Sequence, residues 1–184
     1  MKTILNIKRI FILSFALILF GCDAVLDEKP VNQIATEFFY QNETDALAAL
    51  NAVYADLKSG NGYYRQLFLS NLFGASDQGT PNAGRHGSFR RGTIELTDPN
   101  LPPVWIEIYI GIKDANNVIA RVPEIPEMNE QLRSRVIGEA KFLRALNYFN
   151  LVRCFGEVPL RMTPVLPGQP GLPKSPIADI YDLI

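Results

Sequence analysis

Apolar residues recur at helical spacing in four stretches of this chain, and each stretch predicts an amphipathic α-helix. The first helix begins after an N-cap at Asn42 and ends at Gly60. The second occupies residues 63–73, the third residues 103–122, and the fourth residues 129–153, with Asn129 as its N-cap. Residues 42–184 are therefore predicted to form an all-α domain of stacked helix pairs in the tetratricopeptide style, although the repeat consensus itself is not met.

The same spacing predicts which helix faces are buried. The third helix is expected to bury Trp105, Ile108, Tyr109, Ile112, Ala115 and Ile119. The fourth presents Gly138, Phe142, Ala145, Leu146, Phe149 and Val152 on one face. A glycine inside a helix costs about 1 kcal/mol relative to alanine, so Gly138 predicts a tight helix contact. Trp105 could serve as a flat platform for a sugar ring. Because Trp105 lies in the apolar stripe of the third helix, we interpret it as a core residue instead.

One long segment lacks helical periodicity. Residues 74–103 are dense in Gly, Pro, Asn, Asp and Ser, which predicts a loop, with a short strand at residues 88–96. Loops longer than about 15 residues in a compact domain tend to be functional or disordered. This loop is therefore the first place to look for ligand contacts.

The end of the chain follows a different pattern. Residues 159–176 contain six prolines, which predicts a stiff, extended connection. Ser175 and Pro176 then predict the N-cap and first position of a fifth helix. The apolar face of that helix, Ile177 with Ile180, Tyr181 and Ile184, has no partner in this sequence. We therefore expect the sequence to be a fragment of a longer protein, and expect residues 22–184 alone to be marginally stable or to aggregate.

The first 21 residues are typical of a lipoprotein signal peptide. Lys2, Lys8 and Arg9 precede an apolar run of about 11 residues, which is too short to span a bilayer of roughly 30 Å as a helix. The run ends in the sequence Leu-Phe-Gly-Cys, which resembles a lipobox and predicts lipid attachment at Cys22, with acyl chains that include palmitate. Residues 22–41 would then form a lipid-anchored tether. The alternative is an ordinary cleaved signal followed by a coincidental cysteine.

Charge and composition narrow the classes of function. The net charge is −1, and removal of the leader leaves 15 basic and 19 acidic residues, so a basic nucleic-acid face is not expected. His86 is the only histidine, which gives a histidine-rich metal site or a His-based catalytic triad little support. If Cys22 is lipidated, Cys154 is left without a disulfide partner and is interpreted as a small buried apolar residue. No metal, cofactor or catalytic residue is predicted.

The chain after Cys22 resembles the SusD/RagB family of outer-membrane lipoproteins. The most specific piece is the sequence from Gly138 to Pro159, GEAKFLRALNYFNLVRCFGEVP. Further pieces occur in the family's order: Leu26-Asp27 with Pro30, Phe38-Phe39, Asp45-Ala46 with Ala49 to Tyr54, Trp105 with Tyr109, Ile112 and Ala115-Asn116, and Ser175 with Ile180-Tyr181. Members of this family are several hundred residues long, so the resemblance covers only an N-terminal portion.

This resemblance implies a lipid-anchored protein of the outer membrane, facing the cell surface, that captures a nutrient such as an oligosaccharide. It also implies a partner, a TonB-dependent outer-membrane barrel of the SusC type, to which the nutrient is delivered. No reaction would be catalysed. Two other classes remain: a helical scaffold that recruits surface proteins without binding nutrient, and a hydrolase that uses carboxylates such as Glu107 and Glu139.

The candidate ligand residues lie in the long loop, where the family often places ligand contacts. Glycan binding needs flat rings and polar forks, and the loop offers these in Asp77, Asn82, Arg85, His86, Phe89 and Arg90. Equally, Asp77 and Asn82 could cap turns while the arginines are merely solvated. The charged side chains of the fourth helix, Glu139, Lys141, Arg144 and Arg153, are expected to form structural ion pairs and hydrogen bonds instead.

Overall fold

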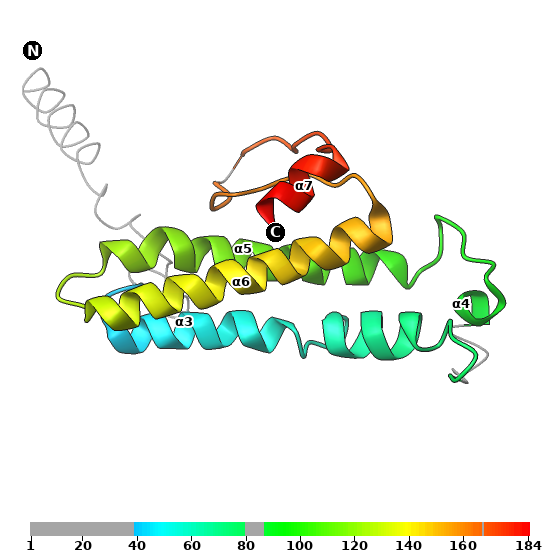
Figure 1. Ribbon diagram of the computed structural model, residues 1–184, viewed down its shortest axis with the longest axis horizontal. Helices are drawn as coiled ribbons and strands as arrows, with labels where there is room; N and C mark the ends of the chain where they lie inside the picture. The colour runs from blue at the N-terminus through cyan, green and yellow to red at the C-terminus, as the bar shows by residue number, and fades with distance from the viewer. Residues whose placement is uncertain (1–38, 80–86, 167) are drawn as a thin grey trace, which may run out of the picture. The chain divides into compact units, whose positions relative to one another are not determined.

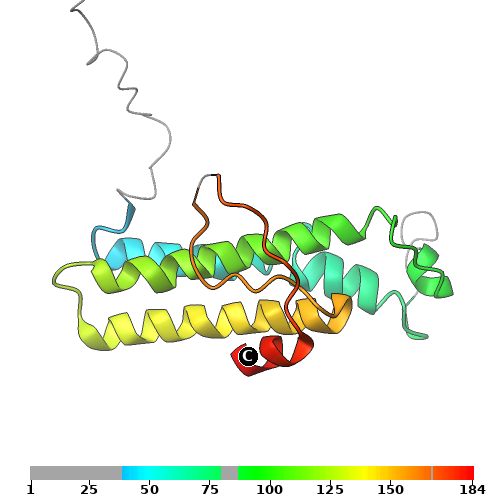
Figure 2. The same cartoon turned by 90° about the horizontal axis from the view of Figure 1, so that it is seen from above.

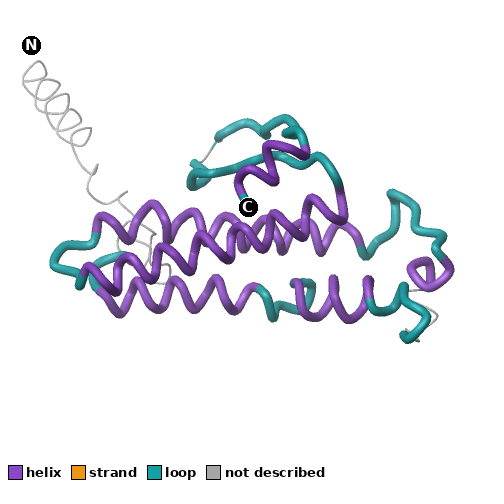
Figure 3. Tube along the Cα trace, in the orientation of Figure 1, coloured by secondary structure: helices purple, strands orange, loops and turns teal. Residues whose placement is uncertain are grey.

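A computed structural model describes residues 39–79, 87–166 and 168–184 of the chain. In chain order the elements are α3 (Glu43–Asp56), the π-helix η1 (Tyr63–Leu72), α4 (Gly87–Arg91), α5 (Leu101–Arg121), the 3₁₀-helix η2 (Val122–Glu124), α6 (Glu130–Phe155) and α7 (Ile177–Leu183) (Figure 1). Within these described ranges the only β-type pairing is an isolated bridge between Val158 and Ser175 (Figure 3). The predicted all-α fold is therefore confirmed.

Side-chain caps begin two of the helices where the sequence predicted. The Asn42 side chain accepts a hydrogen bond from the Asp45 backbone N–H at 3.1 Å, which starts α3. The Asn129 side chain accepts from the Leu132 N–H at 3.0 Å, which starts α6. At the other end of α3 the prediction was too long, because the helix ends at Asp56 and turns occupy the residues up to Gly60.

Helices α5 and α6 form a long hairpin through η2, and α3 and η1 lie end to end along it (Figures 1 and 2). This arrangement creates two apolar cores. The first lies where α3 meets α5 and α6 and includes Leu50, Val53, Val118, Val136 and Leu143. The second lies where η1, α7 and Val158 meet the opposite ends of α5 and α6, and includes Leu67, Ile108, Tyr148, Leu151 and Ile180. Trp105 packs at the edge of the second core, as predicted.

The face that α6 buries differs from the predicted one. Phe142 is 64% exposed, and Gly138 is exposed, with no atom within 4 Å of the position that a Cβ would occupy, so the predicted tight contact is absent there. The close approach occurs instead at Gly111 of α5, where a Cβ would lie 2.8 Å from Asn147 Nδ2. Because α6 contacts α3, α5 and α7, it buries polar side chains as well, namely Arg144, Asn147 and Asn150.

The segment after α6 is extended, as predicted, and crosses α5 and α6. Tyr109 donates from its hydroxyl to the Pro159 carbonyl at 2.8 Å. The Tyr148 hydroxyl donates to the Arg161 carbonyl at 3.0 Å and accepts from the Arg161 N–H at 2.7 Å. Asn116 donates to the same carbonyl at 2.9 Å. We call residues 158–166 the strap, because these bonds hold its backbone against the helix pair.

Four further expectations were wrong. The short strand at residues 88–96 is replaced by α4 and an irregular segment. The third helix begins two residues early, at Leu101, because Pro102 and Pro103 fit its first turn. Ser175 does not cap α7: Pro176 occupies the N-cap position without a side-chain cap, and the Ser175 N–H pairs with the Val158 carbonyl at 3.0 Å. Cys154 is exposed and lines an open pocket near the end of α6, so it is not the buried apolar residue that was expected.

Candidate functional site

Residues 88–100, which lead from α4 to α5, are held in place by a small polar cluster. Ser88 of α4 donates from its hydroxyl to the Asp98 carboxylate. The other oxygen of Asp98 accepts from the backbone N–H and the side-chain amide of Asn100, each at 2.9 Å. These bonds tie α4 to the start of α5. Gly92 has a φ of 66°, which lets the chain turn sharply between them.

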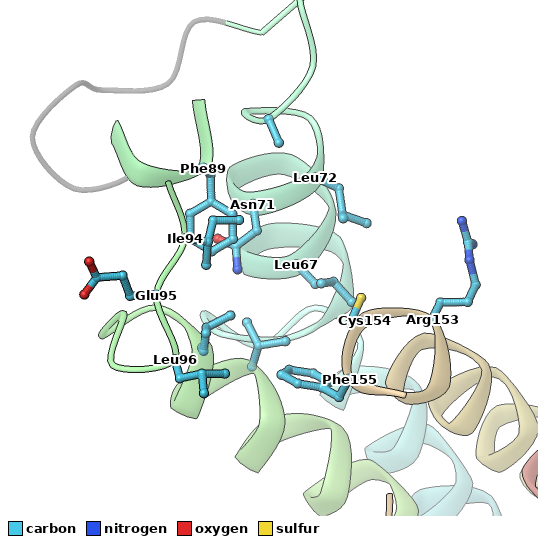
Figure 4. Close-up of a pocket in the computed structure, with 13 residues that line it drawn as sticks. Leu67, Asn71, Leu72, Phe89, Ile94, Glu95, Leu96, Arg153, Cys154 and Phe155 are labelled. Atoms are coloured by element: carbon cyan, nitrogen blue, oxygen red, sulfur yellow. The ribbon is translucent and has the colours of Figure 1, made fainter. Parts of the chain in front are cut away.

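A pocket of about 450 Å³ opens beneath this loop (Figure 4). Its walls come from η1, α4, the segment before α5, and the facing ends of α5 and α6. The apolar wall consists of Leu67, Leu72, Ala75, Phe89, Ile94, Leu96, Leu101, Val104 and Phe155, and Asn71, Glu95, Arg153 and Cys154 complete the lining. The volume lies within the range of about 300–1,000 Å³ that small-molecule sites occupy.

The polar groups of the pocket are few and lie mostly at its rim. The Asn71 side chain is buried and accepts a hydrogen bond from Gln66 Nε2 at 3.0 Å. The Arg153 guanidinium lies 4.9 Å from the centre of the Phe149 ring, a cation–π contact. Desolvation raises the pKa of the Cys154 thiol, although Arg153 opposes this, so the thiol form is favoured. The pocket is built to hold an apolar surface with a few polar contacts.

The predicted ligand residues fall in different places. Phe89 is 6% exposed and lines the pocket, whereas Asp77 and Arg90 are exposed and outside its wall. Asn82, Arg85 and His86 lie outside the described residues, as do Cys22 and the leader. The aliphatic wall could not be recognised from the sequence, because Leu67, Leu101 and Val104 have the same helical spacing as core residues.

Two of the charged side chains of α6, Glu139 and Arg144, have the structural partners that were expected. Glu139 accepts from Arg135 Nε at 2.7 Å and from the Tyr54 hydroxyl at 3.0 Å. The Arg135 bond is the larger cause that lowers the pKa of Glu139, which is the opposite of what a general acid needs. Arg144 donates to Asn116 Oδ1 at 2.8 Å. Lys141 has no ion pair with any described residue.

No helix in the described ranges is both long and apolar enough to cross a membrane. Nor do the His, Cys, Asp and Glu side chains of those ranges gather into a group of three that could hold a metal ion.

Residues 25–179 match the profile of a SusD-like family described as "starch-binding associating with outer membrane". The chain belongs to this family. Among curated SusD-like relatives from Formosa agariphila, protein P2 is 31% identical over 156 residues, and protein P38 is 30% identical over 197 residues. P2 matches 82% of this chain and P38 all of it, but the chain spans only 30% and 36% of their lengths.

Solved SusD-like structures have the same arrangement of helices. A laminarin-binding SusD-like protein is 32% identical, with a TM-score of 0.67 over 78% of this chain and 32% of that one. A SusD superfamily protein of Bacteroides vulgatus is 26% identical, with a TM-score of 0.70 over 79% of this chain and 33% of that one. The SusD-like fold of the described residues is thus shown by sequence and by structure.

Proposed function

We propose that this SusD-like protein is anchored in the outer membrane through a lipid on Cys22, faces the cell surface and captures an oligosaccharide there. The captured sugar is delivered to a TonB-dependent barrel of the SusC type. The family match over residues 25–179 carries the proposal, because the family is described as starch-binding and associated with the outer membrane. The whole protein's substrate and partner remain part of the proposal, since the chain spans about a third of its relatives.

The region around the loop of residues 74–103 supports an oligosaccharide as the ligand. The C–H faces of pyranose rings pack on apolar and aromatic walls, and the pocket beside this loop offers Phe89 and Phe155. Arg90 and Asp77 are exposed nearby in the chain and can pair with hydroxyl groups. Asn82, Arg85 and His86 are proposed to complete the same ligand surface. A laminarin-binding protein among the similar structures makes a β-glucan the first ligand to try.

Ligand binding is tested with the intact protein and a panel of oligosaccharides that begins with laminarin fragments. We expect saturable binding by calorimetry, and about a tenfold loss of affinity in Arg85→Gln, Arg90→Gln and Phe89→Leu, which each remove one proposed contact. Arg65→Gln on η1 is the matched control, because Arg65 is exposed outside the loop. Equal affinity in all four variants would reject these residues as ligand contacts.

The delivery role is tested by purifying the protein from native outer membranes in mild detergent. A stoichiometric TonB-dependent barrel in the purified complex is the expected result. The lipid anchor is tested in the same sample. The protein is digested, and mass spectrometry shows whether the peptide that contains Cys22 is acylated. An unmodified Cys22 would reject lipid anchoring, and absence of a barrel would reject the delivery role.

A second candidate is a scaffold that recruits other surface proteins. It is favoured by a row of exposed apolar side chains on η1 and its C-cap: Tyr64, Phe68, Leu69, Leu72 and Phe73. Exposed apolar patches of this kind mark protein-interaction surfaces. Retention of a soluble protein partner without any glycan binding would favour this function over nutrient capture. We do not propose that the protein hydrolyses its ligand. Release of free sugar from an oligosaccharide by the purified protein would contradict this.

A further inference from the structure

A buried arginine on α6 has no counter-ion. Arg144 is 8% exposed, and its Nη1 donates to Asn116 Oδ1 at 2.8 Å and to the Met162 carbonyl at 3.3 Å. Both acceptors are neutral. Within the described part of the chain, Arg144 takes part in no ion pair and no other hydrogen bond. A buried charge without a partner is costly, so an uncompensated guanidinium indicates an anion that belongs beside it.

The unused donors of Arg144 are not fully enclosed. Its Nε and Nη2 atoms have no hydrogen-bond partner among the described residues. Four polar side-chain atoms in the same ranges are both fully enclosed and without a partner, and neither Nε nor Nη2 of Arg144 is among them. Burial lowers the pKa of Arg144; Tyr148 opposes that shift, and no carboxylate does. Nε and Nη2 together form the fork that matches a carboxylate in a bidentate pair.

Arg144 lines a pocket of about 230 Å³ at the end of α7, which packs beside α6 (Figures 1 and 2). The other lining residues are Lys141, Phe142, Ala145, Leu183 and Ile184. Lys141 lies one turn before Arg144 and adds a second cation. The lining contains no acidic side chain, and Asp179 and Asp182 of α7 are exposed and form no ion pair with a described residue.

We propose that this pocket binds a carboxylate, which bridges the guanidinium of Arg144 and the ammonium of Lys141. The carboxylate comes either from an acidic side chain of the same protein or from a free acid such as a uronic sugar, whose ring can lie on the exposed Phe142. This site is separate from the loop pocket and does not depend on glycan capture. The proposal gives a binding role to Lys141 and Arg144, two cations in the segment from Gly138 to Pro159. The sequence predicted only structural contacts for them.

A zero-length cross-link distinguishes the two sources. A carbodiimide joins a lysine amine to a carboxylate only when the two are in salt-bridge contact, and no Asp or Glu lies three or four residues from Lys141 on its own helix. The intact protein, purified in mild detergent, is treated and digested, and peptides that contain Lys141 are identified by mass spectrometry. A cross-link from Lys141 to an Asp or Glu of the protein supports a side chain as the occupant. Its yield is expected to fall at least fivefold in Arg144→Gln and to be restored in Arg144→Lys.

The second arm uses glucuronate, with methyl glucoside as the neutral probe. Saturable binding with at least a tenfold preference for glucuronate supports a free acid as the occupant. This preference should be lost in Lys141→Gln and kept in the control Lys58→Gln. Circular dichroism checks that each variant folds. If Arg144→Gln does not fold, Ala145→Leu fills the pocket while keeping both cations, and it is expected to abolish either signal. The proposal is overturned if no cross-link forms at Lys141 and glucuronate shows no preferential binding.

Discussion

Single residues decide how closely the helices of this protein approach. Two glycines lie inside long helices, Gly111 in α5 and Gly138 in α6, and the sequence alone favoured the wrong one as the contact point. A Cβ at Gly111 would lie 2.8 Å from Asn147 Nδ2, whereas one at Gly138 meets nothing within 4 Å. Glycine costs helix stability at both positions, but only Gly111 is needed for packing.

The two glycines therefore make a matched pair of variants. We expect Gly111→Ala to lower the free energy of unfolding by about 1–3 kcal/mol, because the new methyl group must displace the buried Asn147 side chain. We expect Gly138→Ala to raise it by about 0.5–1 kcal/mol, since alanine is the better helix former and has space there. Denaturant unfolding of both variants measures the two changes. Loss of stability in Gly138→Ala would contradict this interpretation.

One carboxylate in the first core region is held in an unfavourable setting. Burial raises the pKa of Asp56 to about 6, the charge of Asp114 adds to the increase, and Lys113 opposes it. One oxygen of Asp56 is enclosed and has no hydrogen-bond partner. Because the folded pKa lies above the unfolded one, this group favours the folded state below about pH 4, and that contribution is lost as the pH rises through about 6.

Asp56→Asn removes the charge that becomes unfavourable at neutral pH. We expect the variant to be more stable than the natural protein by about 1 kcal/mol at pH 7.5, after allowance for solvent screening, with the difference vanishing near pH 4. Asp182→Asn on exposed α7 is the control and should change stability by less than about 0.5 kcal/mol at both pH values. A difference that stays constant with pH would show that Asp56 titrates normally.

At the scale of elements, polar side chains on α5 and α6 position the strap. Its residues make no regular strand or helix, so their backbone groups are satisfied by Tyr109, Asn116 and Tyr148 from the helices. The Tyr148 hydroxyl is the central group, because it both donates to and accepts from the Arg161 backbone. Burial of Tyr148 contributes to the rise in its pKa, consistent with its place in the second core.

Tyr148→Phe should release the strap from α6. The substitution keeps the ring but leaves the Arg161 N–H and carbonyl without the hydroxyl, so we expect a loss of about 1–3 kcal/mol in unfolding free energy. Amide hydrogen exchange at Arg161 should become faster than in the natural protein. Tyr181→Phe on the exposed side of α7 is the control. Unchanged exchange at Arg161 would mean that the hydroxyl does not hold the strap.

At the scale of the whole molecule, the π-helix η1 carries an exposed apolar surface. Its backbone bonds include Leu67 N–H to the Gly62 carbonyl and Phe73 N–H to the Phe68 carbonyl, which are five residues apart as in a π-helix. Five apolar side chains of η1 and its C-cap are between 46% and 58% exposed: Tyr64, Phe68, Leu69, Leu72 and Phe73. Such a surface is unfavourable in water and favours association with another apolar surface.

We expect residues 39–184, expressed alone, to self-associate through this surface at micromolar concentration. Light scattering measures the association, and the pair Leu69→Gln with Phe73→Gln should shift the protein toward monomer. The control pair, Leu172→Gln with Val165→Gln, replaces exposed apolar residues outside η1 and should not change the association. A cooperative, reversible melt of a monomer at all concentrations would contradict the expectation.

The sequence determined the helical class of this protein, the two side-chain caps at Asn42 and Asn129, the buried stripe of α5 and the SusD-like family, because each depends on residues that are close together in the chain. It did not determine which face of α6 is buried, the α4 helix, the π-winding of η1 or the aliphatic wall of the loop pocket. Those features depend on contacts between distant segments, which local spacing does not encode. Phe89 is an example: the sequence placed it in the loop, and only the tertiary structure placed it in the wall of the pocket that Phe155 also lines.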